Sequence, residues 1–373
     1  MKISLYAFKF NIDFIIPFNT GKNIINKKEG VLLQLTERNG STGISEISLL
    51  PGFTQGNILS ATEELIRIKN HFKKDDFPEK ISDLFLYTKK LSGELNLSSQ
   101  VAFALDSALL EIYEKTKSEQ AFNLLNYYKK EYSTPPCIKV NTLIVPDEDP
   151  EKTLITLRKI VSAGFDTIKI KTGRMKLEKE NRLLKLISDK YKERLRIRTD
   201  SNMKMCFTEA KELFRGVNPQ MVEYAEDPFT DFKNIPRFFS ETGIKTGVDL
   251  TDQNIDLKKI ISMDGLGSII IKPALTGGIH NIENIFNICR KKDIPLIFSS
   301  LFETGIGLIN IAKVSTLFDY KKSPMGLDTL KYLKKSPLTN LNIIKNGILC
   351  PYKSEFSNLT EKIFIQNSLE RIM

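Results

Sequence analysis

Histidine is scarce in this chain, whose 373 residues include only His71 and His280. Neither histidine stands at the predicted end of a strand next to a plausible nucleophile. Because a nucleophilic triad needs a histidine hydrogen-bonded to its serine or cysteine, this scarcity argues against hydrolase chemistry of that type.

Cysteines and long apolar runs are also sparse. The four cysteines are widely separated and form no CxxC pair: Cys137, Cys206, Cys289 and Cys350. This spacing indicates neither a zinc site nor a disulfide framework, so we expect reduced thiols and a cytoplasmic protein. The chain has no stretch of about 18 apolar residues, and its first residues lack the continuous apolar segment of a signal peptide. We therefore expect neither membrane insertion nor export.

Positive charge exceeds negative charge, with 55 Lys and Arg against 45 Asp and Glu and a formal net charge of +10. The lysines are scattered as short pairs, such as Lys291–Lys292 and Lys334–Lys335, and no basic run is interleaved with aromatic residues. Such pairs are typical of solvated helix faces, so we expect no nucleic-acid partner. The composition is otherwise that of a globular protein, and the length favours two domains.

The first part of the chain mixes two periodicities. Alternation of apolar and polar residues predicts strands near residues 2–8 and 31–35, and helical periodicity follows over 57–71 and 81–91. Loops rich in proline and glycine separate these elements at 17–21 and 50–54. These patterns predict an α+β module over residues 1–98.

A regular alternation of strands and helices follows a predicted helix over residues 99–115. Seven strand candidates precede helical stretches, at 138–144, 167–171, 195–199, 221–225, 245–248, 268–271 and 296–299. Repeated βα units imply a parallel sheet, and this number favours closure into a barrel, predicted over 99–340. A Rossmann fold is not indicated because no GxGxxG follows the first of these strands. The remaining segment, 341–373, is expected to fold back on the first module.

Five charged residues stand at the carboxyl ends of consecutive predicted strands. They are Lys171, Asp200, Glu226, Asp249 and Lys272, separated by 29, 26, 23 and 23 residues, or about one βα unit each. Barrel enzymes place their active sites at this end of the strands. The spacing therefore predicts that all five side chains meet at one mouth of the barrel.

The three acids in this group form the set of hard oxygen ligands that suits Mg²⁺, with Mn²⁺ as a second possibility. Lys171 and Lys272 stand on either side of the acids in strand order, which places them across the mouth from each other. That arrangement is suited to proton transfer on two faces of one carbon. Burial near a divalent cation lowers the pKa of a lysine towards the range of a general base.

Several segments around these positions resemble the enolase superfamily, and within it the o-succinylbenzoate synthases. The segments that carry the resemblance are Ile44–Gln55, Lys169–Lys171, Arg198–Asn202, Glu226–Pro228, Ile271–Gly278, Ser299–Gly307 and Gly326–Leu330. The resemblance implies an α/β fold in which a modified TIM (β/α) barrel carries an N-terminal α+β capping domain. It also implies a lysine base and Mg²⁺ acting on a small-molecule carboxylate; a lysine or histidine base with Mg²⁺ is the pattern known for this superfamily.

The resemblance assigns a role to each matching residue. The acids Asp200, Glu226 and Asp249 become metal ligands, Lys171 the acid and base, and Lys272 the opposing cation. The other matching positions are supporting groups (Lys169, Arg198, Asn202), substrate-binding groups (Ser299, Ser300 and the backbone near Gly326) and lid residues (Pro51, Gly52, Phe53, with the loop over 17–30). The sequence departs from many relatives at Leu250, where they have glutamate, and at Asp227 before Pro228.

The implied reaction is the dehydration of 2-succinyl-6-hydroxy-2,4-cyclohexadiene-1-carboxylate to o-succinylbenzoate by a monomer or homo-oligomer. Two alternatives remain open. A racemase or epimerase of N-succinylamino acids or dipeptides could use the same scaffold, although the region Phe298–Gly305 contains no DxD element of the kind that holds a dipeptide ammonium. A non-catalytic polyanion-binding protein would account for the net charge but not for the five strand-end residues.

Overall fold

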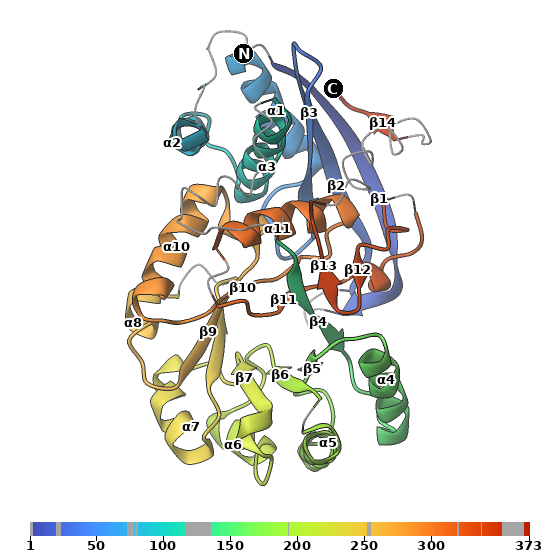
Figure 1. The fold of residues 1–373 in the computed structure, drawn as a ribbon, viewed down its shortest axis with the longest axis vertical. Coiled ribbons are helices and arrows are strands. Elements are labelled where there is room, and N and C mark those ends of the chain that lie inside the picture. Colours follow the sequence, from blue (N-terminus) through green and yellow to red (C-terminus); the bar gives the residue numbers. More distant parts are fainter. Residues whose placement is uncertain are drawn as a thin grey trace.

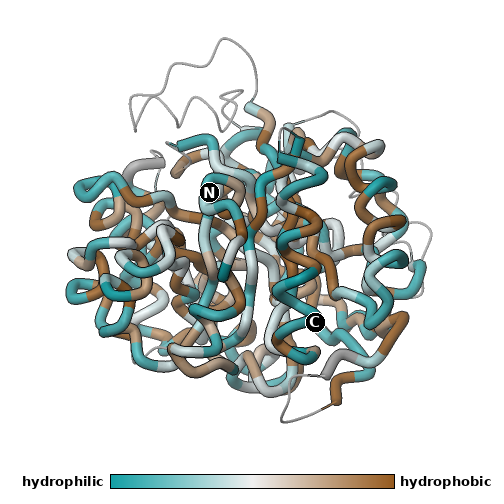
Figure 2. The backbone as a smooth tube through the Cα atoms, turned by 90° about the horizontal axis from the view of Figure 1, so that it is seen from below, coloured by the Kyte–Doolittle hydropathy of each residue, from teal (hydrophilic) through white to brown (hydrophobic). Residues whose placement is uncertain are grey.

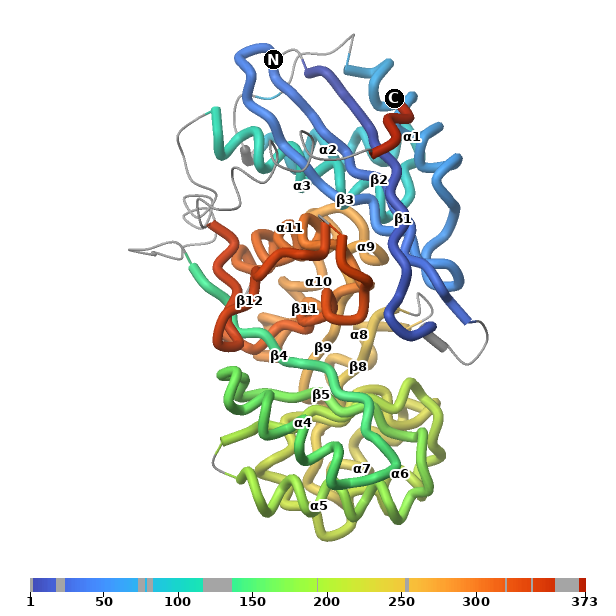
Figure 3. Tube along the Cα trace, turned by 90° about the vertical axis from the view of Figure 1, so that its right-hand side faces the viewer, coloured from blue at the N-terminus to red at the C-terminus, as the bar shows by residue number. Residues whose placement is uncertain are grey.

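The structure is a computed structural model that describes residues 3–19, 24–72, 78, 81–116, 136–192, 194–251, 255–318, 321–336, 338–352 and 369–373. An antiparallel sheet with helices forms one end of the molecule, and strands alternating with helices form the rest (Figures 1 and 3). The predicted α/β fold, a modified barrel with an N-terminal α+β cap, is confirmed. Within the described residues, no helix is both long enough and apolar enough to cross a membrane.

The cap is a sheet of order β14-β1-β2-β3 with helices packed on it. Its strands are β1 (Ile3–Asn19), β2 (Ile24–Glu37), β3 (Thr42–Leu49) and β14 (Glu370–Arg371), and its helices α1 (Ile58–Phe72), α2 (Ile81–Glu94) and α3 (Ser99–Thr116). Alternate residues such as Leu5, Ala7, Val31 and Leu33 face these helices in one buried core. Helix α3 lies beyond residue 98, in the segment assigned to the second domain, but its apolar residues belong to the core of the cap. Strand β14, near the end of the chain, pairs with β1 and so also contacts the cap.

The barrel strands are parallel and adjacent in chain order. They are β4 (Ile138–Ile144), β5 (Thr167–Lys171), β6 (Arg196–Asp200), β7 (Val222–Glu226), β8 (Thr246–Asp249), β9 (Leu266–Ile271), β10 (Leu296–Phe298) and β11 (Met325–Asp328). All seven predicted strands are present within two residues of their expected bounds. The eighth, β11, was not predicted because its four residues include a glycine and an acid and give no apolar run.

The longer helices that follow these strands are amphipathic, except α11, in which nearly every residue is buried. The helices are α4 (Pro150–Ser162), α5 (Leu177–Tyr191), α6 (Phe207–Leu213), α7 (Ile235–Thr242), α8 (Leu257–Ile260), α9 (Pro273–Thr276), α10 (Ile279–Lys291) and α11 (Gly305–Phe318), with 3₁₀ turns η2 (Pro219–Met221), η3 (Phe232–Asn234) and η4 (Leu330–Tyr332). In α5, Leu183, Leu184 and Ile187 recur at helical spacing and are buried against the sheet. Hydrophobic and hydrophilic segments alternate along the tube in Figure 2 as this pattern requires.

The barrel closes between its first and last strands. β11 pairs in parallel with β4, and a single bridge between Ser299 and Gly326 joins the end of β10 to β11. A Cβ atom on Gly326 would lie 2.8 Å from the Ser299 Oγ, so a side chain at this position would require the Ser299 hydroxyl to move. At the start of β4, β13 (Ile348–Leu349) pairs antiparallel with Ile138 and Lys139, and β12 (Ile344–Lys345) pairs with β13.

A buried ionic cluster joins the cap to the barrel. Lys28 of β2 lies 3.8 Å from a Glu46 oxygen of β3 and donates to the Ser48 hydroxyl, while the other Glu46 oxygen accepts from the Thr304 amide at 2.8 Å. Glu303 is also buried beside Lys28 and Glu46. Burial raises the pKa of Glu46 to about 7 although Lys28 opposes this shift. We call Lys28, Glu46 and Glu303 the interdomain cluster.

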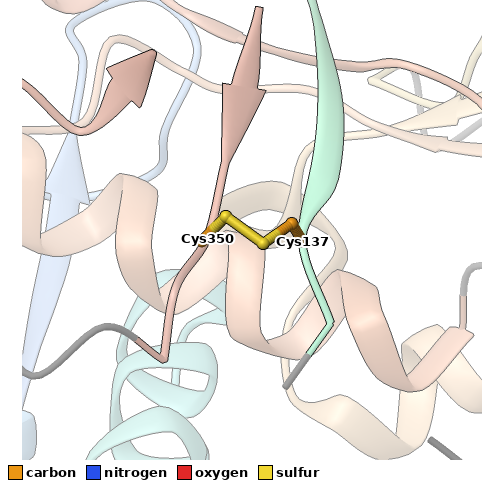
Figure 4. Close-up of a disulfide and its surroundings, with 2 residues drawn as sticks. All are labelled: Cys137 and Cys350. Atoms are coloured by element: carbon orange, nitrogen blue, oxygen red, sulfur yellow. A yellow bond between two sulfur atoms is a disulfide. The ribbon is translucent and has the colours of Figure 1, made fainter. Parts of the chain in front are cut away.

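The expectation of four reduced thiols is wrong, because Cys137 and Cys350 form a disulfide (Figure 4). Cys137 precedes β4 and Cys350 follows β13, and these strands pair antiparallel with Ile138 opposite Leu349. The two cysteines are therefore brought together by a strand pairing across 213 residues, which sequence spacing does not reveal. Within the described residues, the exposed Cys206 and the buried Cys289 are not part of a disulfide.

We expect loss of this disulfide to lower the free energy of unfolding by about 2–4 kcal/mol, because the link restricts a long loop in the unfolded chain. Cys137→Ser should show this loss in urea denaturation under non-reducing conditions, and reducing agent should destabilise the wild type to the same extent. Cys206→Ser is the matched control and should leave the midpoint unchanged. Equal midpoints for wild type and Cys137→Ser would contradict the expectation.

Candidate active site

A cavity of about 230 Å³ lies at the carboxyl ends of the barrel strands, beneath the cap loop that follows β3. The cap contributes Leu50 and Phe53 to its wall, and the barrel contributes residues within or just after β4, β5, β6, β9, β10 and β11. The cavity therefore lies between the two domains at the mouth predicted from the sequence.

The three acids end neighbouring strands in one layer. Asp200 is the last residue of β6, Glu226 of β7 and Asp249 of β8, and all three are buried. The sheet register pairs Asp200 with Glu226 directly. Lys169 of β5 bridges two of the acids, with its Nζ 2.8 Å from an Asp200 oxygen and 2.5 Å from a Glu226 oxygen.

Lys171 and Lys272 contact opposite ends of this acidic row. The Lys171 Nζ lies 2.7 Å from an Asp200 oxygen and donates to the Asn202 side-chain oxygen at 2.8 Å. Lys272 follows β9, forms an ion pair with Asp249 and donates to the Thr251 hydroxyl at 2.8 Å. The five predicted residues thus lie together at one mouth, although their catalytic roles stay predictions.

The lysines differ in their electrostatic surroundings. Burial lowers the pKa of Lys171 below its ordinary value, and the nearby Lys169 ammonium acts in the same direction against the attraction of Asp200. Burial also acts on Lys272, but the contact with Asp249 outweighs it and raises the pKa of Lys272. In the structure, Lys272 is therefore the more firmly protonated of the two.

The acidic row has the donor chemistry of a Mg²⁺ site. One Glu226 oxygen is buried and accepts no hydrogen bond. Burial raises the pKa of Glu226 to about 7, with Asp200 and Asp249 adding to the shift and Lys169 opposing it. A divalent cation would satisfy that oxygen and relieve the repulsion among the acids, so these residues fit such an ion. We find no ready-made metal site in the described part of the chain, that is, no cluster of three or more Asp, Glu, His or Cys side chains arranged to hold a metal ion. In the acidic row, lysine ammoniums contact the acids instead.

Arg198 supports the acidic row from within the barrel. Its guanidinium is fully buried and donates to both oxygens of Glu223, at 2.9 and 3.0 Å, and to the Asn141 side chain at 2.9 Å. It also donates to the Pro324 carbonyl oxygen. These contacts connect β6 with β7, with β4 and with the segment before β11. Arg198 lies two residues before Asp200 in β6.

The predicted substrate-binding residues lie beside the barrel closure. Ser299, Ser300 and Gly326 all line the cavity, and the Ser300 hydroxyl lies 2.8 Å from the Thr329 hydroxyl. Of the predicted lid residues, Phe53 lines the cavity, whereas Pro51 and Gly52 are exposed and do not. The predicted lid loop over 17–30 is wrong in its extent, because β1 runs to Asn19 and β2 begins at Ile24. Residues 20–23 of that segment lie outside the described residues.

Sequence reasoning missed several residues that line the cavity or contact its lysines. Thr251 hydrogen-bonds Lys272, and Arg174, Lys204 and Asp328 line the wall. Arg174 and Lys204 each stand within four residues of a predicted strand-end residue, in the loops where barrel enzymes place their sites. The sequence does not distinguish them, however, from other exposed cations in these loops such as Lys176.

Residues 154–349 match the family described as enolase C-terminal domain-like, which is more than half of the chain. The chain belongs to this family. It is therefore a member of the enolase superfamily, and the resemblance noted in the sequence is confirmed.

Relatives within the enolase superfamily differ in their described activities. The chain is 25% identical to o-succinylbenzoate synthase of Proteus mirabilis over 331 residues, covering 86% of this chain and 90% of that protein. It is 24% identical to the chloroplastic protein PHYLLO of Arabidopsis thaliana over 75% of this chain, but spans only 17% of that longer protein. Its fold is similar to a dipeptide epimerase of Enterococcus faecalis complexed with Mg and L-Leu-L-Tyr, with a TM-score of 0.74, 18% identity and coverage of 90% and 93% of the two chains.

Proposed function

We propose that this member of the enolase superfamily is a hydro-lyase that converts 2-succinyl-6-hydroxy-2,4-cyclohexadiene-1-carboxylate to o-succinylbenzoate. The observation that carries the proposal is the placement of Lys171 and Lys272 at opposite ends of the buried acidic row. The similarity to o-succinylbenzoate synthase over most of both chains supports the choice of reaction.

In the proposed mechanism, the neutral Lys171 amine removes the proton next to the ring carboxylate. The electrons of the broken C–H bond move onto that carboxylate, giving an enediolate. They then return to form the ring double bond as the C–O bond to the hydroxyl breaks. The Lys171 ammonium gives its proton to the departing hydroxyl, so the products are the aromatic acid and water. Lys272 stays charged and stabilises the developing anion.

We propose that Asp200, Glu226 and Asp249 hold Mg²⁺, or Mn²⁺ in its place. A bound divalent cation supplies neutralisation of the charge that develops on the substrate carboxylate. Lys169 contacts Asp200 and Glu226. The Asn202 backbone amide also donates to Asp200 Oδ1, at 3.1 Å. These contacts orient the acids and support their place in the site.

A racemase or epimerase is the second candidate, because the fold is also similar to dipeptide epimerases. A dipeptide brings a terminal ammonium that needs a free carboxylate. Among the described cavity-lining residues the acids are Asp200 and Asp328, and Asp328 is paired with Lys331 while Asp200 is paired with Lys169 and Lys171. This pairing favours a substrate without an ammonium, which leaves N-succinylamino acids as the stronger alternative.

The deciding experiment is an assay of the purified chain with Mg²⁺ and the cyclohexadiene substrate, following the aromatic product by absorbance and chromatography. Formation of o-succinylbenzoate with loss of water supports the proposal. Racemisation of an N-succinylamino acid without dehydration would favour the second candidate. Salt-sensitive retention on a nucleic-acid column without any turnover would favour the polyanion-binding alternative.

We propose that the protein is cytoplasmic and that the proposed reaction takes place there. The Cys137–Cys350 disulfide would be reduced by the thiol pool of that compartment. Cysteine labelling of the protein in intact cells tests this proposal, since two additional reactive thiols are expected if the link is open.

Phe53 is expected to act as the cap's contact with substrate, because it is the predicted lid residue that lines the cavity. Phe53→Ala should raise KM by about 10-fold, since the loss of apolar contact with a bound ring costs on the order of 1–2 kcal/mol. The affinity for Mg²⁺ should change little, because Phe53 lies on the cap and the acids on the barrel. Unchanged kinetics for Phe53→Ala would show that this loop is no lid.

A further inference from the structure

Two cations at the cavity, Arg174 and Lys204, have no part in the mechanism above. Both line the cavity and both are exposed. Within the described residues, neither side chain forms an ion pair with a carboxylate, whereas the inner lysines Lys169, Lys171 and Lys272 all contact acids. The inner lysines therefore already have acidic partners, and the outer two cations are available to an anion that enters from solvent.

The loop that carries Arg174 is held in place by a buried acid. Glu180, in the first turn of α5, accepts the backbone N–H groups of Gly173, Arg174 and Met175 at 2.9, 2.9 and 3.0 Å. The Glu180 side chain is buried, and among the described residues it forms no ion pair. Its carboxylate is therefore held by the three amides. Three hydrogen bonds to consecutive amides fix the backbone from which Arg174 extends, which reduces the entropy lost when the guanidinium binds a ligand.

Lys204 comes from the adjacent loop after β6. Asn202 and Met203 have left-handed backbones, with φ of 48° and 57°, and the Met203 amide donates to the Asp227 carbonyl oxygen at 2.8 Å. A Cβ atom on Gly173 would lie 3.4 Å from the Lys204 Cβ, so the two loops are in contact. The arginine and the lysine thus extend from neighbouring, ordered backbones beside Lys171.

We propose that Arg174 and Lys204 form a subsite for a second carboxylate of the substrate, remote from the carbon that loses its proton. A guanidinium presents paired N–H donors that match a carboxylate, and a nearby ammonium adds charge. The same two cations would repel a substrate with an ammonium at that end. The inference rests on the proposed function in that the substrate binds in this cavity, and it requires a substrate with a second carboxylate, which both the proposed substrate and an N-succinylamino acid carry.

Calorimetric titration of the purified chain in Mg²⁺ tests this subsite without turnover. The ligands are o-succinylbenzoate and the analogue in which the chain carboxylate is replaced by a primary amide. The wild type should bind the diacid at least about 10-fold more tightly, the usual weight of hydrogen bonds to a charged group. The double variant Arg174→Met/Lys204→Met should lose this preference and keep its affinity for the amide, while Arg174→Lys should keep part of it.

Lys176→Met is the matched control, since Lys176 is an exposed lysine near Arg174 that does not line the cavity. It should keep the full preference for the diacid. An unchanged preference in the double variant, or none in the wild type, overturns the subsite. If the wild type binds neither benzoate, the comparison is repeated with an N-succinylamino acid and its chain amide, and failure to bind this pair also overturns it.

The outcomes separate the subsite from the proposed dehydration. A diacid preference that depends on Arg174 and Lys204 in a protein without dehydratase activity supports the subsite and overturns the proposed reaction. If the protein catalyses the dehydration but its preference for the diacid is the same without Arg174 and Lys204, the proposed reaction is supported and the subsite is overturned.

Discussion

Lys171→Arg is expected to reduce dehydration by at least about 10²-fold, because arginine keeps the positive charge but has too high a pKa to accept the proton. Lys272→Arg should retain measurable activity, since this position needs only a cation, and Lys272→Ala should be far less active than Lys272→Arg. Initial rates of formation of the aromatic product, with saturating Mg²⁺, give this ranking. The different contacts of the two lysines, Asp200 and Asn202 for one and Asp249 and Thr251 for the other, are consistent with different tasks.

Lys190→Arg, on an exposed position of α5, is the control for the effect of the substitution itself. An active Lys171→Arg with an inactive Lys272→Arg would reverse the assignment of the base. If both arginine variants were equally inactive, exchange of solvent deuterium into unreacted substrate would identify the base: the variant that retains exchange still has it.

Glu226→Gln is expected to lower turnover by about 10³-fold, because the neutral amide weakens the binding of a divalent cation to the acidic row. Glu226 lies at the centre of that row, and one of its oxygens has no hydrogen-bond partner in the structure. Isothermal titration with Mg²⁺ and turnover as a function of Mg²⁺ concentration measure the two effects. Treatment of the wild type with EDTA should remove activity, and added Mg²⁺ should restore it.

The variant should remain folded, because removal of one charge from a crowded acidic row relieves repulsion. Thermal unfolding followed by circular dichroism checks this, with the exposed Glu178→Gln as the matched control. Full activity in the metal-stripped wild type would contradict the metal requirement altogether.

The positions of the five charged residues could be predicted because each ends a strand whose apolar run is visible in the sequence. In a parallel barrel the carboxyl ends of all strands lie at one mouth, so matched positions on β5 to β9 imply proximity without any alignment of contacts. The same reasoning fails for β11, whose sequence Met-Gly-Leu-Asp has no strand signal and becomes a strand only by pairing with β4. The tertiary partner, not the local pattern, decides that element.

The disulfide and the outer cations could not be predicted for a related reason. Cys137 and Cys350 meet through the pairing of β4 with β13, a short strand with no independent signal. Arg174 and Lys204 look like ordinary surface residues in the sequence, and only the contact between their loops distinguishes them from other exposed cations. The proximity of these groups therefore depends on contacts between segments far apart in the sequence, which the local pattern does not reveal.

The interdomain cluster bears on how the molecule unfolds. If the cap separated from the barrel, Glu46 would lose its Thr304 donors and Lys28 its nearby Glu303, and the pair of Lys28 with Glu46 within the cap would become exposed to water. A partly unfolded molecule with one domain intact would lose these contacts between the domains. Calorimetry should consequently show one cooperative transition, and amide hydrogens in the cap and barrel cores should exchange with similar protection.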